Sequence, residues 1–214
     1  EAPKEESFLE IPSHQACLDD KEKYIDLFKA FYDNNDPIYS KGLYQEVDGR
    51  FLIQNPPSRH MEEEEMDKIA SFPYQRDAHP YNETIKFSIM THHGCWGECN
   101  FCAIAAHQGR TIRTRSEKNI LAEAKHFTTM KDFKGIISDV GGPTANMYGY
   151  ECVKKMNLGT CIENKRCVDA HRLCRTMKVD HSRNIKLLKD IRAVPGIKKA
   201  FVASGVRYDL ITAD

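Results

Sequence analysis

The sequence predicts a mixed α/β fold in which three parallel strands alternate with helices and follow a small α+β lead-in. Short apolar runs, typical of buried strands, end in glycine-rich or cysteine-rich loops, and stretches with helical periodicity lie between them. Strands and helices that alternate at this spacing form right-handed βαβ units, so we expect the strands to pair in parallel. Such a sheet is either an open doubly wound layer or part of a (βα) barrel, and in both folds ligands bind at the carboxyl ends of the strands.

The predicted lead-in covers residues 1–80 and contains a helix, a hairpin and a second helix. Residues 19–33 begin with an acidic turn, which favours a helix. The apolar face of this helix, which we expect in the core, consists of Tyr24, Leu27, Phe28 and Phe31. Residues 43–55 alternate around an Asp-Gly pair and predict a hairpin. Residues 61–72 predict a short helix with glutamates at its start.

The second predicted domain, residues 81–214, holds the parallel strands. The expected strands are 84–91, 133–143 and 197–208, and the expected helices between them are 116–132 and 182–194. The first of these helices follows Ser116, a residue type that caps helix N-termini. A cysteine-rich insertion at about 147–181 precedes the last helix.

Three polar or glycine-rich features follow the predicted strands. They are the cysteine loop after the first strand, Gly141-Gly142 after the second and Ser204-Gly205 after the third. Because the carboxyl ends of parallel strands meet at one edge of a sheet, we expect these features to converge on one face.

The cysteine loop carries the strongest chemical signal. Cys95, Cys99 and Cys102 lie close together in the stretch THHGCWGECNFCAIAAHQG. Thiolates are the usual ligands of a 4Fe-4S cluster, and one curled, glycine-containing loop can supply three of them. Because no fourth cysteine follows directly in the loop, one iron of such a cluster would be left open to an exogenous ligand. The competing interpretation is a zinc site with His92 or His93 as a fourth ligand.

The segment CWGECNFC, between a predicted strand and a predicted helix, resembles the radical S-adenosylmethionine (radical SAM) signature Cys-x3-Cys-x-aromatic-Cys. FSIMTHHGCWGECNFCAIAAHQGRTIRTRS, DVGGPTANMYG and KKAFVASGVRYD, together with DPIYSKGLYQ and FLIQNPP, resemble the YgiQ-like family of uncharacterised radical SAM proteins. The resemblance implies a partial radical SAM (βα) barrel of which only the first half is readable. The chain also starts without Met, so we expect a piece of a longer protein, which by itself need not be active.

The resemblance also implies a set of site residues. Cys95, Cys99 and Cys102 would ligate a 4Fe-4S cluster, and the amino and carboxylate groups of SAM would chelate its fourth iron. Phe101 would pack near the adenine. In the family, the glycine-rich motif after the second strand usually ends in Glu, whereas here Pro143 and Thr144 follow, so a backbone carbonyl or Thr144 would contact the SAM amino group. The expected cofactor-binding residues are Phe101, Gly141, Gly142, Thr144 and Ser204, and no catalytic residue is assigned beyond the cluster.

The implied activity is reductive cleavage of SAM to a 5′-deoxyadenosyl radical, which abstracts hydrogen from an unknown small-molecule or macromolecular substrate. The implied partner is an electron donor such as flavodoxin or ferredoxin. The alternative is a non-enzymatic zinc-binding or iron–sulfur electron-transfer module in which the cysteines are structural.

Four further cysteines, Cys152, Cys161, Cys167 and Cys174, lie in the insertion and form a candidate second metal site. A second cluster or a tetrahedral zinc ion would pin this segment. Four unrelated thiols, or disulfides formed on handling, are the alternative. His171 and His181 are further candidate ligands, or plain surface residues.

Charged residues after the cysteine loop and past the third strand are candidates for binding a cofactor or a substrate. Arg110, Arg113 and Arg115 would suit a SAM carboxylate or an anionic substrate, and a solvated loop is the alternative. Arg207 and Asp209, just past the third strand, are candidate pocket residues.

The composition of the chain bears on its partners and its cellular location. Lys+Arg and Asp+Glu both number 31, so net charge indicates neither a nucleic-acid nor a membrane partner. No apolar run is long enough to span a bilayer. The chain is far longer than small disulfide scaffolds, so its eight cysteines favour a reducing, cytoplasmic location.

Overall fold

The computed structural model describes residues 3, 6–76, 85–150, 152–161, 167–169 and 172–214. The chain forms two compact units, each described here by itself. The N-terminal unit consists of Glu1–His60 with Val153–Lys165, and the second unit of Met61–Cys152 with Arg166–Asp214. These units are defined by their compactness and not by independent folding. The predicted domains 1–80 and 81–214 therefore stay a prediction.

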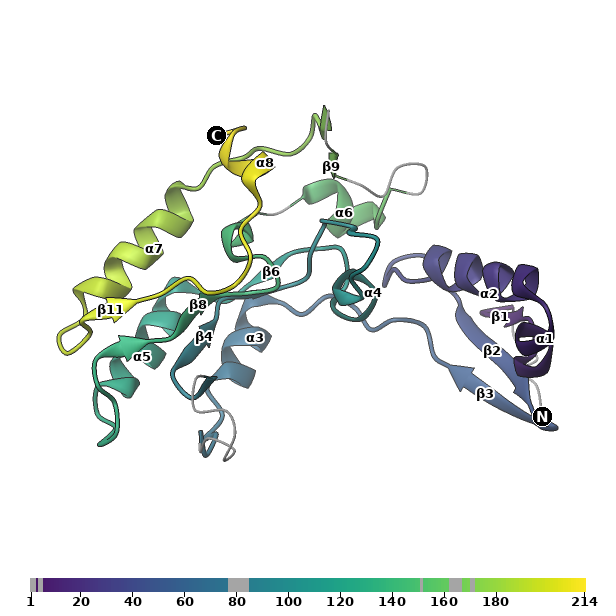
Figure 1. Cartoon of the computed structure of the whole chain (residues 1–214), viewed down its shortest axis with the longest axis horizontal. Coiled ribbons are helices and arrows are strands. Elements are labelled where there is room, and N and C mark those ends of the chain that lie inside the picture. The colour runs from purple at the N-terminus through teal and green to yellow at the C-terminus, as the bar shows by residue number, and fades with distance from the viewer. Residues whose placement is uncertain (1–2, 4–5, 77–84, 151, 162–166, 170–171) are drawn as a thin grey trace. The chain divides into compact units, whose positions relative to one another are not determined.

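The N-terminal unit is built on a three-stranded sheet in the order β1-β2-β3 (Figure 1). β2 and β3 form the predicted hairpin, with Asp48 at φ 49° and Gly49 at φ 73°. Two successive positive φ values match the twist of a tight hairpin, which explains the Asp-Gly pair. The elements of this unit are β1 (Phe8–Ile11), α1 (His14–Asp19), α2 (Lys21–Asp33), β2 (Gly42–Val47), β3 (Arg50–Gln54) and α6 (Val153–Leu158).

The aromatic face of α2 does not form a core in the described part of this unit. Tyr24 is 59% exposed and Phe28 is 54% exposed, whereas Leu27 and Phe31 are half-buried. The expectation that this face lies in the core is therefore wrong for Tyr24 and Phe28. The predicted helix itself is confirmed, because Asp20 caps it by accepting a hydrogen bond from the Glu22 amide.

The second unit contains parallel strands within the three predicted segments, but they are shorter than predicted, and segment 133–143 holds two of them. β4 (Ser88–Met90) pairs in parallel with β8 (Asp139–Gly141), and β7 (Ile136–Ile137) pairs in parallel with β11 (Lys199–Ala200). Phe201 links the pairs, since its amide donates to the Ile137 carbonyl and its carbonyl accepts from the Val140 amide. The mixed α/β class and the parallel pairing are confirmed, and closure into a radical SAM barrel stays a proposal.

Two helices cover this small sheet, α5 (Glu117–Phe127) and α7 (Ser182–Ala193) (Figure 1). Their inner faces are fully buried at Ile120, Phe127 and Leu187. Burying each of these side chains contributes roughly 1.5–3 kcal/mol. The core of this unit therefore lies between the helices and the strands whose carboxyl ends carry the predicted site.

The remaining elements of the second unit are short. They are α3 (Glu63–Ala70), β5 (His92–His93), α4 (Ile104–Gln108), β6 (Arg113–Thr114), a 3₁₀ turn (Ala145–Met147), β9 (Val168–Asp169), β10 (Arg172–Leu173) and α8 (Tyr208–Ile211). β5 and β6 pair in antiparallel fashion and close the base of the cysteine loop. Among the described residues of both units, no helix has the length and apolar character needed to cross a membrane.

Candidate functional site

The cysteine loop lies between β5 and α4 and closes on itself through backbone hydrogen bonds. The Cys95 amide donates to the Gly109 carbonyl over 3.1 Å, and the Cys102 amide donates to the Cys99 carbonyl over 3.0 Å. Gly94 has φ 83°, a conformation that side chains rarely adopt. Backbone hydrogen bonds and the conformation of Gly94 therefore hold the loop in a curl.

A buried ion pair ties the middle of the loop to its far end. Glu98, between the first two cysteines, accepts from Arg110, and both side chains are at most 6% exposed. Glu98 also has φ 47°, an uncommon value for a non-glycine residue. Breaking one partner of a buried pair leaves an uncompensated charge, so this pair fixes the loop's shape.

Gly97 brings two of the three sulfurs together. Its amide donates to Cys95 Sγ over 3.3 Å. A Cβ added to Gly97 would lie 3.3 Å from Cys95 Sγ and 3.6 Å from Cys99 Sγ. Cys95 is partly buried, whereas Cys99 and Cys102 are exposed. The absent side chain therefore lets two thiols and Arg207 Nη1 approach the same point.

The three predicted loops do lie side by side. Thr144 Oγ1 lies 3.4 Å from Cys95 Sγ, and a Cβ on Gly141 would lie 3.2 Å from Ser204 Oγ. The Ala145 amide donates to the Gly205 carbonyl over 2.9 Å. The carboxyl ends of the strands thus gather these residues, and their roles toward a cofactor stay predictions.

His92 is buried beneath the glycine pair and does not face the cysteines as a ligand would. Its Nε2 donates to the Thr144 carbonyl over 3.1 Å, and its Nδ1 lies 2.9 Å from Thr91 Oγ1. Burial lowers the pKa of His92 to about 4, so the ring is neutral near pH 7. A Cβ on Gly142 would lie 2.7 Å from this ring, which explains the glycine.

Two other predicted cofactor residues have different surroundings. Phe101 is 92% exposed. Ser204 donates its hydroxyl proton to Asp139 over 2.5 Å, and Asp139 also accepts from the Ala203 amide. Ser204 therefore holds the end of the third strand in place, whatever else it contacts.

The three loop arginines form neither a solvated loop nor a free anion site. Arg110 pairs with Glu98. Arg113 donates to the Met61 carbonyl and to Glu62, and Arg115 pairs with Glu123 and donates to Asn119 and to the Met90 carbonyl. All three are buried. Their charge is used within the protein, which corrects both interpretations drawn from the sequence.

The four insertion cysteines are spread over different surroundings. Cys167 and Cys174 pack in an apolar cluster with Trp96, and Cys174 Sγ lies 3.1 Å from Thr176 Oγ1. Cys152 is partly buried, and Cys161 belongs to the N-terminal unit. In the described ranges, no three His, Cys, Asp or Glu side chains converge as ligands of one ion. The second metal site stays a prediction.

Of the two candidate histidines of the insertion, only His181 lies in the part of the chain that the structure describes. His171 lies outside the described residues. His181 is buried, with Nδ1 2.9 Å from Asp214 Oδ2 and Nε2 3.1 Å from Asn146 Nδ2. His181 is thus a structural link, a role that no local pattern indicates.

The donor chemistry of Cys95, Cys99 and Cys102 suits an iron–sulfur cluster. A tetrahedral ion needs its ligands within bonding distance of one point, whereas in a cluster each thiolate binds its own iron atom. The donors are soft thiols on one curled loop, with an amide directed at a sulfur and two of the sulfurs beside Gly97. Backbone donation to a ligand sulfur is a known feature of iron–sulfur sites.

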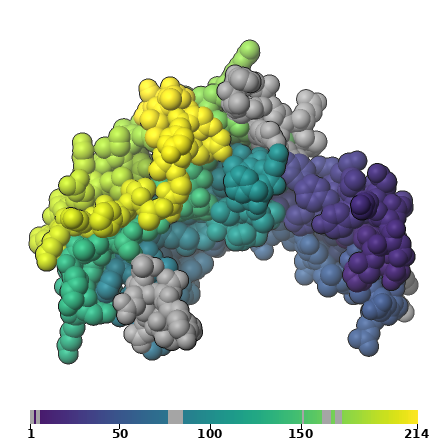
Figure 2. All heavy atoms as spheres, viewed as in Figure 1, coloured from purple at the N-terminus to yellow at the C-terminus, as the bar shows by residue number. Residues whose placement is uncertain are grey.

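Arg207 was a candidate pocket residue, and it reaches the cysteine loop. Its Nη1 lies 3.5 Å from the Gly97 carbonyl oxygen. In Figure 2 the yellow C-terminal segment lies beside the teal segment that includes this loop. Asp209 pairs with Arg207 and holds it.

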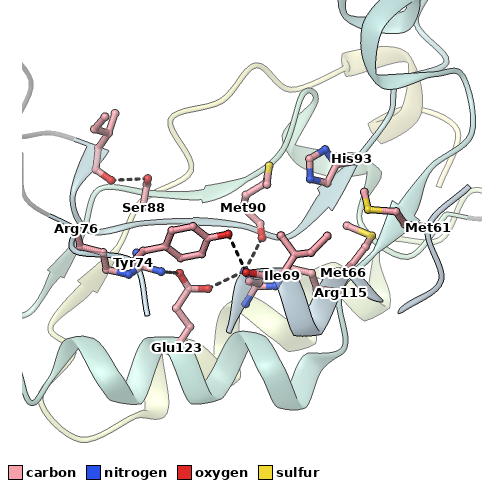
Figure 3. Close-up of a pocket in the computed structure, with 12 residues that line it drawn as sticks. Met61, Met66, Ile69, Tyr74, Arg76, Ser88, Met90, His93, Arg115 and Glu123 are labelled. Atoms are coloured by element: carbon pink, nitrogen blue, oxygen red, sulfur yellow. Dashed lines mark hydrogen bonds and ion pairs between the residues drawn. The ribbon is translucent and has the colours of Figure 1, made fainter. Parts of the chain in front are cut away.

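A separate cavity of about 300 Å³ lies between α3, β4 and α5 (Figure 3). Its walls are mainly apolar, with Met66, Ile69 and Met90, and an ion pair of Glu123 with Arg76 and Arg115 lies at one side. His93 also lines it, and burial lowers the pKa of this histidine. None of its described lining residues is a cysteine. The lining residues come from distant parts of the sequence, so no local pattern signals the cavity.

Comparison with known proteins identifies relatives. Residues 1–92 match the family described as Radical SAM N-terminal. The chain is 51% identical over 98% of its length to a UPF0313 protein of Fusobacterium nucleatum, and 45% identical over 97% to one of Methanocella arvoryzae. It is 42% identical over 98% to a UPF0313 protein of Clostridium perfringens. The chain covers 38%, 35% and 33% of these relatives, so it spans little more than a third of their length.

Proposed function

Because this chain belongs to an uncharacterised radical SAM-like family, we propose that its cysteine loop holds a 4Fe-4S cluster that acts with SAM. The observation that carries this proposal is the position of Cys95, Cys99 and Cys102. They lie on one pre-curled loop at the carboxyl ends of parallel strands, where such folds bind ligands.

The residues of the chain would hold and shield the cofactor. The three thiolates would each bind one iron, and the Gly97 amide would stabilise the Cys95 sulfur. Thr144, whose hydroxyl lies 3.4 Å from Cys95 Sγ, would contact the SAM amino group where the family's motif usually has Glu. His92 holds the Thr144 carbonyl from below, which fixes this contact.

When bound, the cluster and SAM would supply radical chemistry, namely a 5′-deoxyadenosyl radical able to abstract hydrogen from a substrate. The apolar packing of Trp96 and Met147 beside the loop would limit access of water to this side of the site. The family match suggests an enzyme, and because the chain spans little more than a third of its relatives' length, the reaction itself is part of this proposal.

We propose a cytoplasmic location, because a reducing compartment keeps ligand thiols free. Cys17, Cys95, Cys99, Cys102, Cys152 and Cys161 are free thiols in the structure. The proposed partner is a one-electron donor protein such as flavodoxin or ferredoxin.

The test is anaerobic reconstitution of the full-length protein with iron and sulfide. We expect a brown protein, an EPR signal of the reduced cluster that SAM perturbs, and release of 5′-deoxyadenosine under reducing conditions. Cys99→Ala should abolish the SAM-dependent change and the release, and Cys17→Ala, outside the loop, should leave both unchanged.

Three other results would contradict this proposal or part of it. Uptake of zinc alone, with no effect of SAM, would support a zinc-binding module. A cluster that SAM does not perturb would support an electron-transfer module. A Cys99→Ala variant as active as the parent would remove Cys99 from its assigned role.

A further inference from the structure

Arg207 places a guanidinium against the cysteine loop. A Cβ on Gly97 would lie 2.7 Å from Arg207 Nη1, 3.3 Å from Cys95 Sγ and 3.6 Å from Cys99 Sγ. The same Nη1 lies 3.5 Å from the Gly97 carbonyl oxygen. One cation therefore shares a small space with two of the three sulfurs.

Asn146 fixes the backbone of Arg207. Asn146 Oδ1 accepts from the Arg207 amide over 2.9 Å, and Asn146 Nδ2 donates to the Arg207 carbonyl over 3.0 Å. Asn146 is buried on the turn that follows the glycine pair. The segment after the third strand is thus docked onto the segment after the second.

Asp209 fixes the side chain of Arg207. It accepts from Arg207 Nε over 3.0 Å and pairs with Nη2, which leaves Nη1 directed toward the loop. The hydrogen bond to Asp209, and then the charges of Cys99 and Cys95, raise the pKa of Arg207, so the guanidinium stays positive. Its side chain is 20% exposed, which limits screening by solvent.

We propose that Arg207 is a positioning residue that sets the reduction potential of the cluster bound by Cys95, Cys99 and Cys102. This inference rests on the proposed function. The step is a one-electron reduction in which an external reductant gives its electron to the oxidised cluster, and no bond or proton is exchanged. A fixed positive charge beside two ligands favours the state with the extra negative charge, so it raises the potential.

The negative charge of Asp209 allows a second test of the direction in which the reduction potential shifts. Its carboxylate lies behind the guanidinium, and pairing with Arg207 lowers its own pKa, so it stays negative. Removing the positive charge should lower the potential, whereas removing the negative charge should raise it. A purely structural disturbance of the loop would not shift the potential in opposite directions.

The test measures the midpoint potential of the reconstituted full-length protein, without SAM, by dithionite titration followed by EPR. Arg207→Gln should lower the reduced-to-oxidised ratio at a fixed potential by about tenfold, a shift of about 59 mV for one electron. Arg207→Lys should stay close to the parent, and Asp209→Asn should shift the potential upward. Iron and sulfide content per chain are measured in parallel.

A second readout needs no cluster. In the apoprotein at one fixed pH, Arg207→Gln should slow alkylation of Cys99 by iodoacetamide several-fold relative to Cys17. Mass spectrometry of the two cysteine peptides gives both rates from one sample.

The two proposals fail in different ways. If the parent and all variants bind the same cluster with the same potential, Arg207 does not tune it, and the proposed function stands. If the parent binds no cluster, the proposed function fails. In that case an unchanged alkylation rate of Cys99 in Arg207→Gln would overturn the electrostatic role of Arg207 as well.

Discussion

At the residue scale, the site depends on side chains that are small, neutral or already paired. Gly97 leaves space beside two sulfurs, and Gly142 leaves space for the ring of His92. His92 is buried and neutral because burial outweighs the hydrogen bond to the Thr144 carbonyl, and its pKa falls to about 4. A neutral ring can support Thr144 without adding a charge beneath the cysteine loop.

The lowered pKa of His92 makes stability depend on pH. In the unfolded chain a histidine binds a proton below about pH 6.5, whereas in the fold His92 stays neutral down to about pH 4. Stability is therefore full above pH 6.5 and falls as the pH drops toward 4. From pH 7.5 to pH 5 we expect a loss of about 2 kcal/mol from this residue.

Urea unfolding of the parent and of His92→Gln at these two pH values checks the expectation. The variant should lose about 2 kcal/mol less than the parent between them. His126→Gln, an exposed change on α5, serves as the matched control and should follow the parent. Equal pH dependence in His92→Gln and the parent would contradict the buried, neutral state of His92.

At the element scale, the start of α5 is joined to α3. Ser116 Oγ accepts from the Asn119 amide over 3.1 Å as the predicted N-cap, and the same hydroxyl donates to Asp67 of α3 over 2.5 Å. The Ser116 amide also donates to Asp67. The cap therefore orders its own helix and docks α3 beside the cavity in Figure 3.

Ser116→Ala removes both side-chain bonds at once. We expect a loss of about 1–2 kcal/mol in the free energy of unfolding, the range for a helix cap. Ser116→Thr keeps the hydroxyl and should lose much less. Chemical denaturation of the three proteins measures the difference, and equal midpoints for the Ala and Thr variants would show that the hydroxyl contributes nothing.

At the scale of the whole molecule, the chain leaves the second unit and returns to the N-terminal one. Asp36 is 2% exposed and accepts from the Thr160 amide over 2.7 Å, across 124 positions of sequence. Gly159 has φ 80°, and Tyr39 donates its hydroxyl proton to the Thr160 carbonyl over 3.2 Å. Part of the cysteine-rich insertion is thus anchored by a carboxylate in the N-terminal unit, with no metal needed at that point.

Asp36→Ala should release this anchor. We expect faster hydrogen exchange and faster proteolytic cleavage within residues 153–161, because the buried Thr160 amide loses its acceptor. Asp26→Ala, in an exposed pair with Lys23, is the matched control and should change little. Unchanged exchange at Thr160 in Asp36→Ala would show that other contacts hold the segment.

Local patterns in the sequence were enough to predict the hairpin, the long helices, the cap at Ser116, the parallel strands and the cysteine loop. These features depend on periodicity, turn residues and caps within a few positions, which a sequence displays directly. The convergence of the cysteine loop, Gly141-Gly142 and Ser204-Gly205 was also predictable from the sequence, because parallel strands share one carboxyl edge.

Only the tertiary structure decided what the charged and aromatic side chains do. It paired the three loop arginines internally, exposed Phe101 and the face of α2, and placed Arg207 beside Gly97 across 110 positions of sequence. A charged residue looks the same in a sequence whether its side chain is solvated, paired or directed at a ligand. Packing between distant segments determines the partner of that side chain, so only the tertiary structure shows it.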